Sequence, residues 1–280
     1  MKDIIMDTLI DGVKLIPFLF IAFLIIELIE HKLSNKSKNI ISKAGKFGPF
    51  FGSLLGAIPQ CGFSVLTTNL YVTRIVTLGT LMSVYLSTSD EMIPVMLSQN
   101  VSLKLIIGII IIKVIIGMTF GFIIDFILRR KHKIAKIDYE ICHEDNCDCE
   151  HHLILSVIKH TISTTLFIML ITFLLNLLIE YTGIFDSNNI IASNPFTVFL
   201  TSLIGLIPNC ASSVMITTLY VKGVISYAAL ISGLLTNSGV GILVLFKSSK
   251  DIRSSFTIIS ILYIIGVISG ILFELVGVFI

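Results

Sequence analysis

The chain contains one unusual segment twice, and this repeat limits the folds that are possible. The first copy covers residues 52–72 and the second covers residues 201–221, at an offset of 149 residues without a gap. Over the longer windows 53–89 and 202–238, 16 of 37 positions are identical. A repeat that covers this much of a 280-residue chain predicts two homologous halves.

Each copy is an apolar run that is interrupted by Ile-Pro-(Gln/Asn)-Cys and continues through hydroxyl residues to Tyr-Val. The whole chain is 55% hydrophobic and 14% charged, with a mean hydropathy of +0.97. This composition excludes an ordinary soluble domain and indicates a polytopic membrane protein. Within a bilayer, an apolar segment interrupted in corresponding places of two halves is typical of a transporter's binding site.

Six further segments have the length and apolar character of membrane spans. They are residues 8–30, 75–97, 104–128, 154–180, 224–246 and 255–279. The two motif segments, 47–73 and 196–222, are ambiguous. As one helix each would be about 40 Å long, but if broken at its proline each gives limbs of about 18–20 Å, too short for a ~30 Å core.

The positions of basic residues favour broken hairpins that enter and leave the membrane on one side. With hairpins, the lysine-rich loop 31–46 and the basic run 129–136 lie on the same, cytosolic side. The loops 98–103 and 181–195, which contain no Lys or Arg, are then external, and Lys222 is the one clear exception. The central loop is therefore expected in the cytosol and both termini outside.

These observations predict an all-α polytopic membrane protein built from two inverted-topology repeats. Each repeat is expected to contain three spanning helices plus one broken or re-entrant helical hairpin, which makes ten helical segments in all. The first transmembrane repeat covers residues 1–136 and the second, inverted repeat covers residues 153–280. A cytosolic linker rich in Cys, His and acidic residues, 137–152, joins them.

Asp90 and Glu91 are the most distinctive polar residues, because they lie inside a predicted span where one ionised carboxylate is already costly. Pro94 stands four residues after Asp90 and deprives its carbonyl of a helical donor. A carboxylate beside a freed carbonyl is a ligand set of the oxygen type for a cation. The matching stretch of the second half has no acid, but Asn237 supplies a neutral oxygen and Gly239 permits an unwound backbone.

The hairpin tips hold the other candidate substrate ligands. Pro59 and Pro208 leave backbone carbonyls without donors there, and both are predicted helix breaks, as are Pro94 and Gly239. The candidate ligands at or after the tips are Gln60, Cys61, Ser64 and Thr68 in the first copy and Asn209, Cys210 and Ser213 in the second. For a single Ser or Thr, the alternative is close packing between membrane helices.

Two charged residues inside spans are candidates for ion coupling. Lys113 lies in the middle of its span, and its repeat partner is Leu262. It is a candidate counter-charge to Asp90 or Glu91, or a group displaced when a cation binds. Glu27 is a candidate proton relay, although a packing hydrogen bond explains it equally well. By contrast, Asp125 and Glu274 lie near span ends and are expected at the membrane interface.

The linker concentrates ligands that transition metals prefer. These residues are Cys142, His143, Cys147, Cys149, His151 and His152. Their irregular spacing does not match a folded zinc module, so we expect a flexible metal-collecting or sensing loop, with a merely solvated charged linker as the alternative. Five cysteines divided between the tips and this loop do not form a disulfide framework.

The paired Ile-Pro-(Gln/Asn)-Cys motifs, the Thr-Ser-Asp-Glu stretch at 88–91 and the Cys/His-rich linker resemble the ten-transmembrane heavy-metal exporter family. Members of this family carry the names arsenic efflux protein and manganese transporter, and the resemblance extends over nearly the whole chain. It implies efflux of a metal across the bacterial cytoplasmic membrane. The expected partners are the lipid bilayer and the metal ion, with a possible homodimer and no nucleic acid.

The carboxylates favour a divalent transition-metal cation, Mn²⁺ first, because a neutral arsenical has no obvious use for them. We expect a proton-coupled secondary exporter with no tightly bound cofactor and no enzyme activity, since the chain has no P-loop. The alternative is an arsenite or organoarsenical permease that uses Cys61 and Cys210. A membrane-embedded thiol redox enzyme with the same cysteines is more remote, and a purely structural partner protein is opposed by the intramembrane acids.

Overall fold

The computed structural model describes residues 47–59, 61–89, 92–131, 195–249 and 252–276, with isolated helical positions at 16–24 and 158–174. The described part of each half contains five helices, and these ranges contain no strand. In the first half they are α3 (Gly48–Gly56), α4 (Cys61–Val72), α5 (Leu78–Ser87), α6 (Met92–Ser98) and α7 (Leu103–Lys131). In the second half they are α9 (Pro195–Gly205), α10 (Cys210–Val221), α11 (Tyr227–Thr236), α12 (Gly241–Ser248) and α13 (Ile252–Val276).

The helix boundaries repeat with the sequence. Helices α4 and α10 begin and end at positions that differ by the offset of the sequence repeat, and so do α5 and α11. Helices α6 and α7 likewise begin at the positions equivalent to the starts of α12 and α13. The same local signals therefore produce the same sequence of elements twice.

Both motif segments are interrupted at their prolines. Helix α3 ends at Gly56 and α4 begins at Cys61, while α9 ends at Gly205 and α10 begins at Cys210. A proline within a helix removes a backbone donor and clashes with the preceding turn, which accounts for a break at Pro59 and Pro208.

The segments 75–97 and 224–246, expected as single spans, are each divided as well. The first is interrupted after α5, where Thr88 and Ser89 are not helical, and the second after α11, at residues 237–240. Gly239 lies in the second interruption with φ of 57°, a conformation that glycine adopts without strain. Pro94 is not the break itself, because it lies in the first turn of α6, where a missing N–H costs nothing.

The number of helical segments expected from the sequence, ten, is therefore too low. The ranges described above already contain ten helices, and further helical positions occur at 16–24 and 158–174. The reason is that polar and glycine residues, Thr-Ser-Asp-Glu in one half and Asn-Ser-Gly in the other, end α5 and α11 inside runs that are otherwise continuously apolar.

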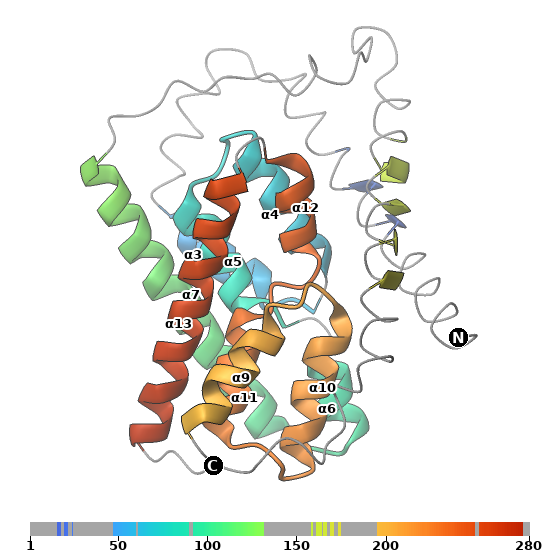
Figure 1. Cartoon of the computed structure of the whole chain (residues 1–280), viewed down its shortest axis with the longest axis vertical. Helices are drawn as coiled ribbons and strands as arrows, with labels where there is room; N and C mark the ends of the chain where they lie inside the picture. Colours follow the sequence, from blue (N-terminus) through green and yellow to red (C-terminus); the bar gives the residue numbers. More distant parts are fainter. Residues whose placement is uncertain are drawn as a thin grey trace, which may run out of the picture.

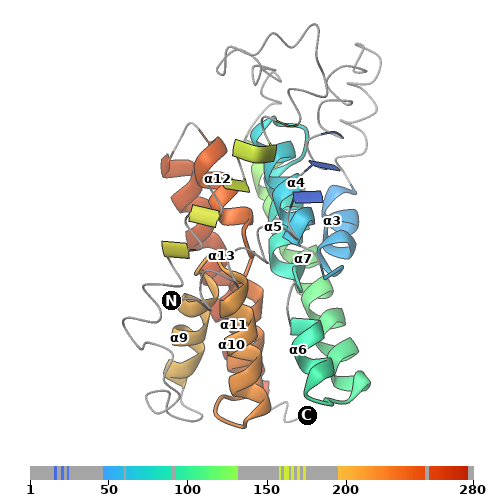
Figure 2. The same cartoon turned by 90° about the vertical axis from the view of Figure 1, so that its right-hand side faces the viewer.

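In each half, three helices pack closely together: α3, α5 and α7 in the first, and α9, α11 and α13 in the second. The remaining helices pack across the boundary between the two halves. Helix α4 packs on α12, and α10 packs on α6 (Figures 1 and 2). The α4–α12 pair lies toward one end of the molecule and the α6–α10 pair toward the other, while α7 and α13 run in opposite directions along the long axis (Figure 1).

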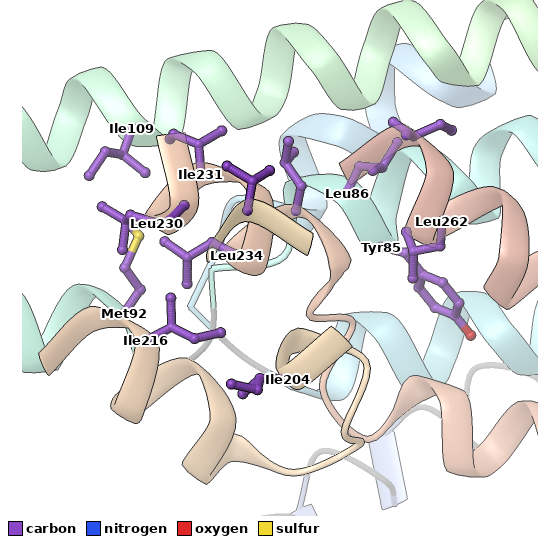
Figure 3. Packing of buried hydrophobic residues seen from close by; sticks show 14 of the residues in the cluster. Tyr85, Leu86, Met92, Ile109, Ile204, Ile216, Leu230, Ile231, Leu234 and Leu262 are labelled. Carbon is purple, nitrogen blue, oxygen red and sulfur yellow. The ribbon is translucent and has the colours of Figure 1, made fainter. Parts of the chain in front are cut away.

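The core lies where the two halves meet. Leu230, Ile231 and Leu234 of α11 pack there with Met92 of α6 and Ile216 of α10 (Figure 3). Among the described residues, three helical stretches are long and apolar enough to cross a membrane: Leu103–Leu128, Tyr227–Ser248 and Ile252–Val276. Over an apolar window of 18 residues in each, 94% of the interrupted stretch Tyr227–Ser248 is buried, but only 28% of Leu103–Leu128 and 39% of Ile252–Val276. The uninterrupted helices thus lie at the periphery and the interrupted one lies inside.

Candidate transport site

Several of the residues singled out in the sequence lie outside the described residues. These are Gln60, Asp90, Glu91, Glu27 and the linker residues Cys142, His143, Cys147, Cys149, His151 and His152. The backbones of Cys61 and Cys210 are described, as the first residues of α4 and α10, but their side chains are not. The site is therefore built from the residues that flank them.

The described residues of the first interruption, Thr88 and Ser89, directly precede Asp90 and Glu91 and are contacted by a lysine of α7. Thr88 and Ser89 are both buried, and the ammonium nitrogen Nζ of Lys113 donates a hydrogen bond to the carbonyl oxygen of Thr88. Lys113 is only 1% exposed although it comes from the middle of α7. The side chain predicted to serve as a counter-charge thus reaches the end of α5, where the helix dipole is negative.

The second interruption is held by its own amide instead. The Asn237 side-chain oxygen Oδ1 accepts a hydrogen bond from the backbone N–H of Gly239, at 2.9 Å. Asn237 and Ser238 are buried, and no described residue forms a hydrogen bond with the Ser238 hydroxyl. The residue equivalent to Lys113 is Leu262, a fully buried member of the apolar core. The two interruptions therefore lie at equivalent positions of the two halves but contain different polar groups.

Ser64 and Thr68, predicted from the first motif, lie where α4 meets α12. The Thr68 hydroxyl Oγ1 lies 2.6 Å from the Tyr85 hydroxyl and donates to the Ser64 carbonyl at 2.6 Å. A Cβ atom on Gly241 would lie 3.0 Å from the Ser64 Cβ and 2.9 Å from the Tyr85 ring, so only glycine permits α12 to approach this closely. We call Ser64, Thr68, Tyr85 and Gly241 the α4–α12 seam.

Sequence reasoning missed Tyr85, which is fully buried and is the one large polar side chain of this seam. The repeat did not point to it, because the equivalent residue in the second half is Leu234. The available signal was a tyrosine inside a predicted span rich in hydroxyl residues, since a tyrosine buried there needs a partner for its hydroxyl.

At the second hairpin tip, between α9 and α10, Asn209 makes the hydrogen bonds that hold the turn. The Asn209 side-chain oxygen accepts from the N–H of Ala211 at 3.2 Å and caps α10, and the Ser212 hydroxyl donates to the Asn209 carbonyl at 2.7 Å. Ser213 is buried in the next position. Further along α10, the fully buried Thr217 hydroxyl has no partner among the described residues, and the repeat counterpart of Tyr85, which contacts Thr68, is Leu234.

The carboxylates near the ends of α7 and α13 have a structural role at the N-termini of the neighbouring helices. Asp125 is buried rather than exposed at a span end, and it accepts from the Thr77 hydroxyl at 2.7 Å and from the Gly79 N–H at 2.9 Å. Glu274 lies at the equivalent place, 3.3 Å from the Ser226 hydroxyl. A carboxylate at a helix N-terminus complements the dipole, so each one fixes the start of α5 or α11.

Within the described ranges, no three His, Cys, Asp or Glu side chains come together in a way that could hold a metal ion. The described residues at the two interruptions offer hydroxyls, backbone carbonyls, one amide and one ammonium. A metal-binding set with carboxylates at this place would have to include Asp90 and Glu91, which directly follow Thr88 and Ser89 in the chain.

Two long peripheral apolar helices, interrupted helices inside and paired polar interruptions define a polytopic membrane protein of the transporter class. Comparison with protein families makes the assignment specific: the profile described as "Putative, 10TM heavy-metal exporter" matches residues 1–193 and again residues 186–278. The chain belongs to this family of heavy-metal exporters. Searches of curated proteins and of solved structures found no match.

Proposed function

We propose that this protein is a proton-coupled secondary exporter of a divalent transition-metal cation, Mn²⁺ in the first place. Asp90 and Glu91 are the proposed cation ligands, with Gln60, Asn209 and Asn237 as neutral oxygen donors around them. Carboxylate, amide and carbonyl oxygens are the ligands that Mn²⁺ prefers. The observation that carries the proposal is the buried, unwound backbone that directly precedes the two acids and is already held by the Lys113 ammonium.

The opposite directions of α7 and α13 support two repeats with inverted topology (Figure 1). Helices α3 and α4 contain 9 and 12 residues. They are therefore about 14 and 18 Å long, each shorter than a ~30 Å hydrocarbon core, which supports a re-entrant hairpin. In this reading the α4–α12 seam closes one end of the pathway and the α6–α10 contact closes the other.

Alternating access would open one of these contacts while the other stays closed. A cation that reaches Asp90 and Glu91 from the cytosol displaces the Lys113 ammonium from the negative end of α5, because like charges repel at close range. After the opposite contact opens, protonation of the carboxylates releases the cation. Lys113 then returns to the Thr88 carbonyl, and Glu27 is a candidate for carrying the proton onward.

An Asp90→Asn variant tests the ligand role. The substitution keeps the shape of the side chain and removes its charge, so we expect Mn²⁺ export by cells to fall at least tenfold, corresponding to about 1.4 kcal/mol or more of lost cation binding. The matched control is Asp186→Asn, in the predicted external loop 181–195, which should export normally. Intracellular metal is measured in cells grown in Mn²⁺ or Zn²⁺. Normal export by the Asp90→Asn variant would disprove the ligand role.

The arsenical alternative is favoured by one observation: Cys61 and Cys210 are the first residues of α4 and α10 and occupy equivalent positions. Trivalent arsenic binds thiolates, and two facing thiols suit it. The same growth experiment therefore includes arsenite and methylarsenite. Arsenical resistance that depends on both cysteines, together with unchanged Mn²⁺ levels, would replace the cation proposal by this one.

A further inference from the structure

The internal repeat allows the two interruptions to be compared as if they were two related structures. Thr88 and Ser89 at the end of α5 correspond to Asn237 and Ser238 at the end of α11. Lys113 of α7 corresponds to Leu262 of α13. Because the helix boundaries also correspond, a difference in polar groups between the two places reflects a difference in what each place binds.

At the first interruption, a cation belonging to the chain occupies the end of the helix. The Lys113 ammonium donates to the Thr88 carbonyl, and the Ser89 hydroxyl donates to the Ser87 carbonyl at 3.1 Å. The last carbonyls of a helix have no intrahelical donors and carry the negative end of its dipole. A positive charge at this position is therefore the expected complement.

At the second interruption, the position of Lys113 is taken by Leu262, which has no donor to offer to the Asn237 carbonyl. The hydroxyl of Ser238 has no hydrogen-bond partner among the described residues, although Ser238 is 0% exposed. An unpaired buried hydroxyl costs about 1–3 kcal/mol, so a buried one is normally satisfied by something. Its counterpart Ser89 is satisfied.

We propose that an alkali cation binds at the end of α11, with the Asn237 carbonyl and the Ser238 hydroxyl among its ligands, in the role that the Lys113 ammonium has at the end of α5. Carbonyl and hydroxyl oxygens at an unwound helix end are the usual ligands of Na⁺ in transporters with interrupted helices. Residues 236–241 contain no carboxylate, so the ligands that this segment itself supplies are neutral oxygens, which suit a monovalent cation.

The other unpaired buried hydroxyls do not share this setting. Thr217 lies inside α10, and Ser255 lies in the first turns of α13, so neither is at a helix C-terminal end. Neither has a repeat counterpart bound by a cation of the chain. Ser255 is equally buried and equally without a partner, which makes it the matched control for Ser238.

The site goes beyond the proposed export activity, and it is tested without any transition metal. Purified full-length protein in detergent is incubated with radiolabelled Na⁺, with chelator present, and challenged with unlabelled NaCl, KCl or choline chloride at constant ionic strength. We expect displacement by NaCl or KCl and not by choline. We also expect a saturating alkali salt to raise the apparent unfolding temperature over choline chloride by about 5 °C at roughly a hundred times Kd.

The Ser238→Ala variant should weaken this binding at least tenfold, whereas Ser255→Ala should bind as the unchanged protein does. A second variant, Leu262→Lys, supplies a tethered ammonium at the proposed site and should abolish alkali-ion binding in protein that still elutes as a monodisperse peak. Equal responses to Na⁺, K⁺ and choline in the unchanged protein would overturn the proposal. Equal binding by the two serine variants would also overturn it. Either result leaves the proposed export of Mn²⁺ untouched, because that is measured separately in cells.

Discussion

At the scale of single residues, many buried hydroxyls of the described helices donate to a carbonyl of their own helix. Thr67 donates to the Phe63 carbonyl at 2.8 Å, and Thr201 donates to the Thr197 carbonyl at 2.9 Å. Such bonds make a polar residue compatible with an apolar environment, but they hold no two elements together. The polar contacts between elements are therefore the informative ones, and Thr68 with Tyr85 is among them.

Replacing Tyr85 by Phe tests the contribution of this contact. The ring and its packing stay, and Thr68 keeps its bond to the Ser64 carbonyl, so only one buried hydrogen bond between α4 and α5 is lost. We expect a loss of about 1 kcal/mol, or about 2–4 °C in apparent unfolding temperature. Tyr263→Phe is the control, because its hydroxyl makes only a 3.5 Å contact near the surface. An unchanged unfolding temperature for Tyr85→Phe would show that the contact contributes nothing.

The sequence singles out Ser64 and Thr68 as candidate substrate ligands and Lys113 as a candidate for ion coupling. The structure describes all three as buried, and their roles stay predictions. Tyr85 escaped because its repeat counterpart is Leu234, so the repeat carried no signal for it. The contact between Lys113 and the Thr88 carbonyl depends on how α5 crosses α7, which no spacing along the chain determines.

At the scale of elements, the crossing of α5 and α7 depends on two glycines that bring the backbones together. A Cβ atom on Gly79 would lie 2.2 Å from the Gly121 carbonyl oxygen and 2.5 Å from the Asp125 carboxylate. The same carboxylate accepts from the Gly79 N–H and so fixes the start of α5. Close approach through small residues is the usual way in which membrane helices gain contact, and here it also positions the interruption at the other end of α5.

Gly79→Ala should therefore separate α5 from α7 and shift Thr88 relative to Lys113. Overpacking of this kind costs about 1–3 kcal/mol. We expect a fall in apparent unfolding temperature together with a loss of metal export. Gly108→Ala, elsewhere on α7, is the control, since nothing lies within 4 Å of a Cβ there. Alanine favours a helix over glycine by about 1 kcal/mol, so the control should be at least as stable as the unchanged protein. If both variants unfold alike, the glycine contact is not what sets the helix crossing.

The sequence predicted the elements unevenly, for a physical reason. Proline acts locally by removing a donor, so the interruptions at Pro59 and Pro208 could be predicted from the residue alone. The interruptions after α5 and after α11 occur in runs of spanning length, where length and hydropathy indicate one continuous helix. Polar and glycine residues end the helices there, but their carbonyls also need partners, and a partner such as Lys113 for Thr88 is known only once the helices are packed.

At the scale of the whole molecule, the two halves are joined by helices of one half that pack on helices of the other. Helix α4 of the first half packs on α12 of the second, and α10 of the second packs on α6 of the first (Figure 2). The two contacts between the halves differ in character. Hydroxyls and Gly241 line the α4–α12 contact, whereas the α6–α10 contact buries Met92 and Met96. Packing of this kind couples movements at the two ends of the molecule, because each half contributes one helix to both contacts.

The proposed topology makes a prediction that separates re-entrant hairpins from full crossings. If residues 47–73 enter and leave on one side, the loop 31–46 and the linker 137–152 share the cytosolic side, and full crossing would put them on opposite sides. A membrane-impermeant maleimide should label the native linker cysteines only in inside-out vesicles. It should label Ser37→Cys, in a variant whose three linker cysteines are serine, from the same side. Asn188→Cys, in the loop 181–195 and in the same variant without linker cysteines, is the control and should react only from outside. Labelling of Ser37→Cys and the linker from opposite sides would disprove the re-entrant hairpin and, with it, the inverted arrangement of the two halves.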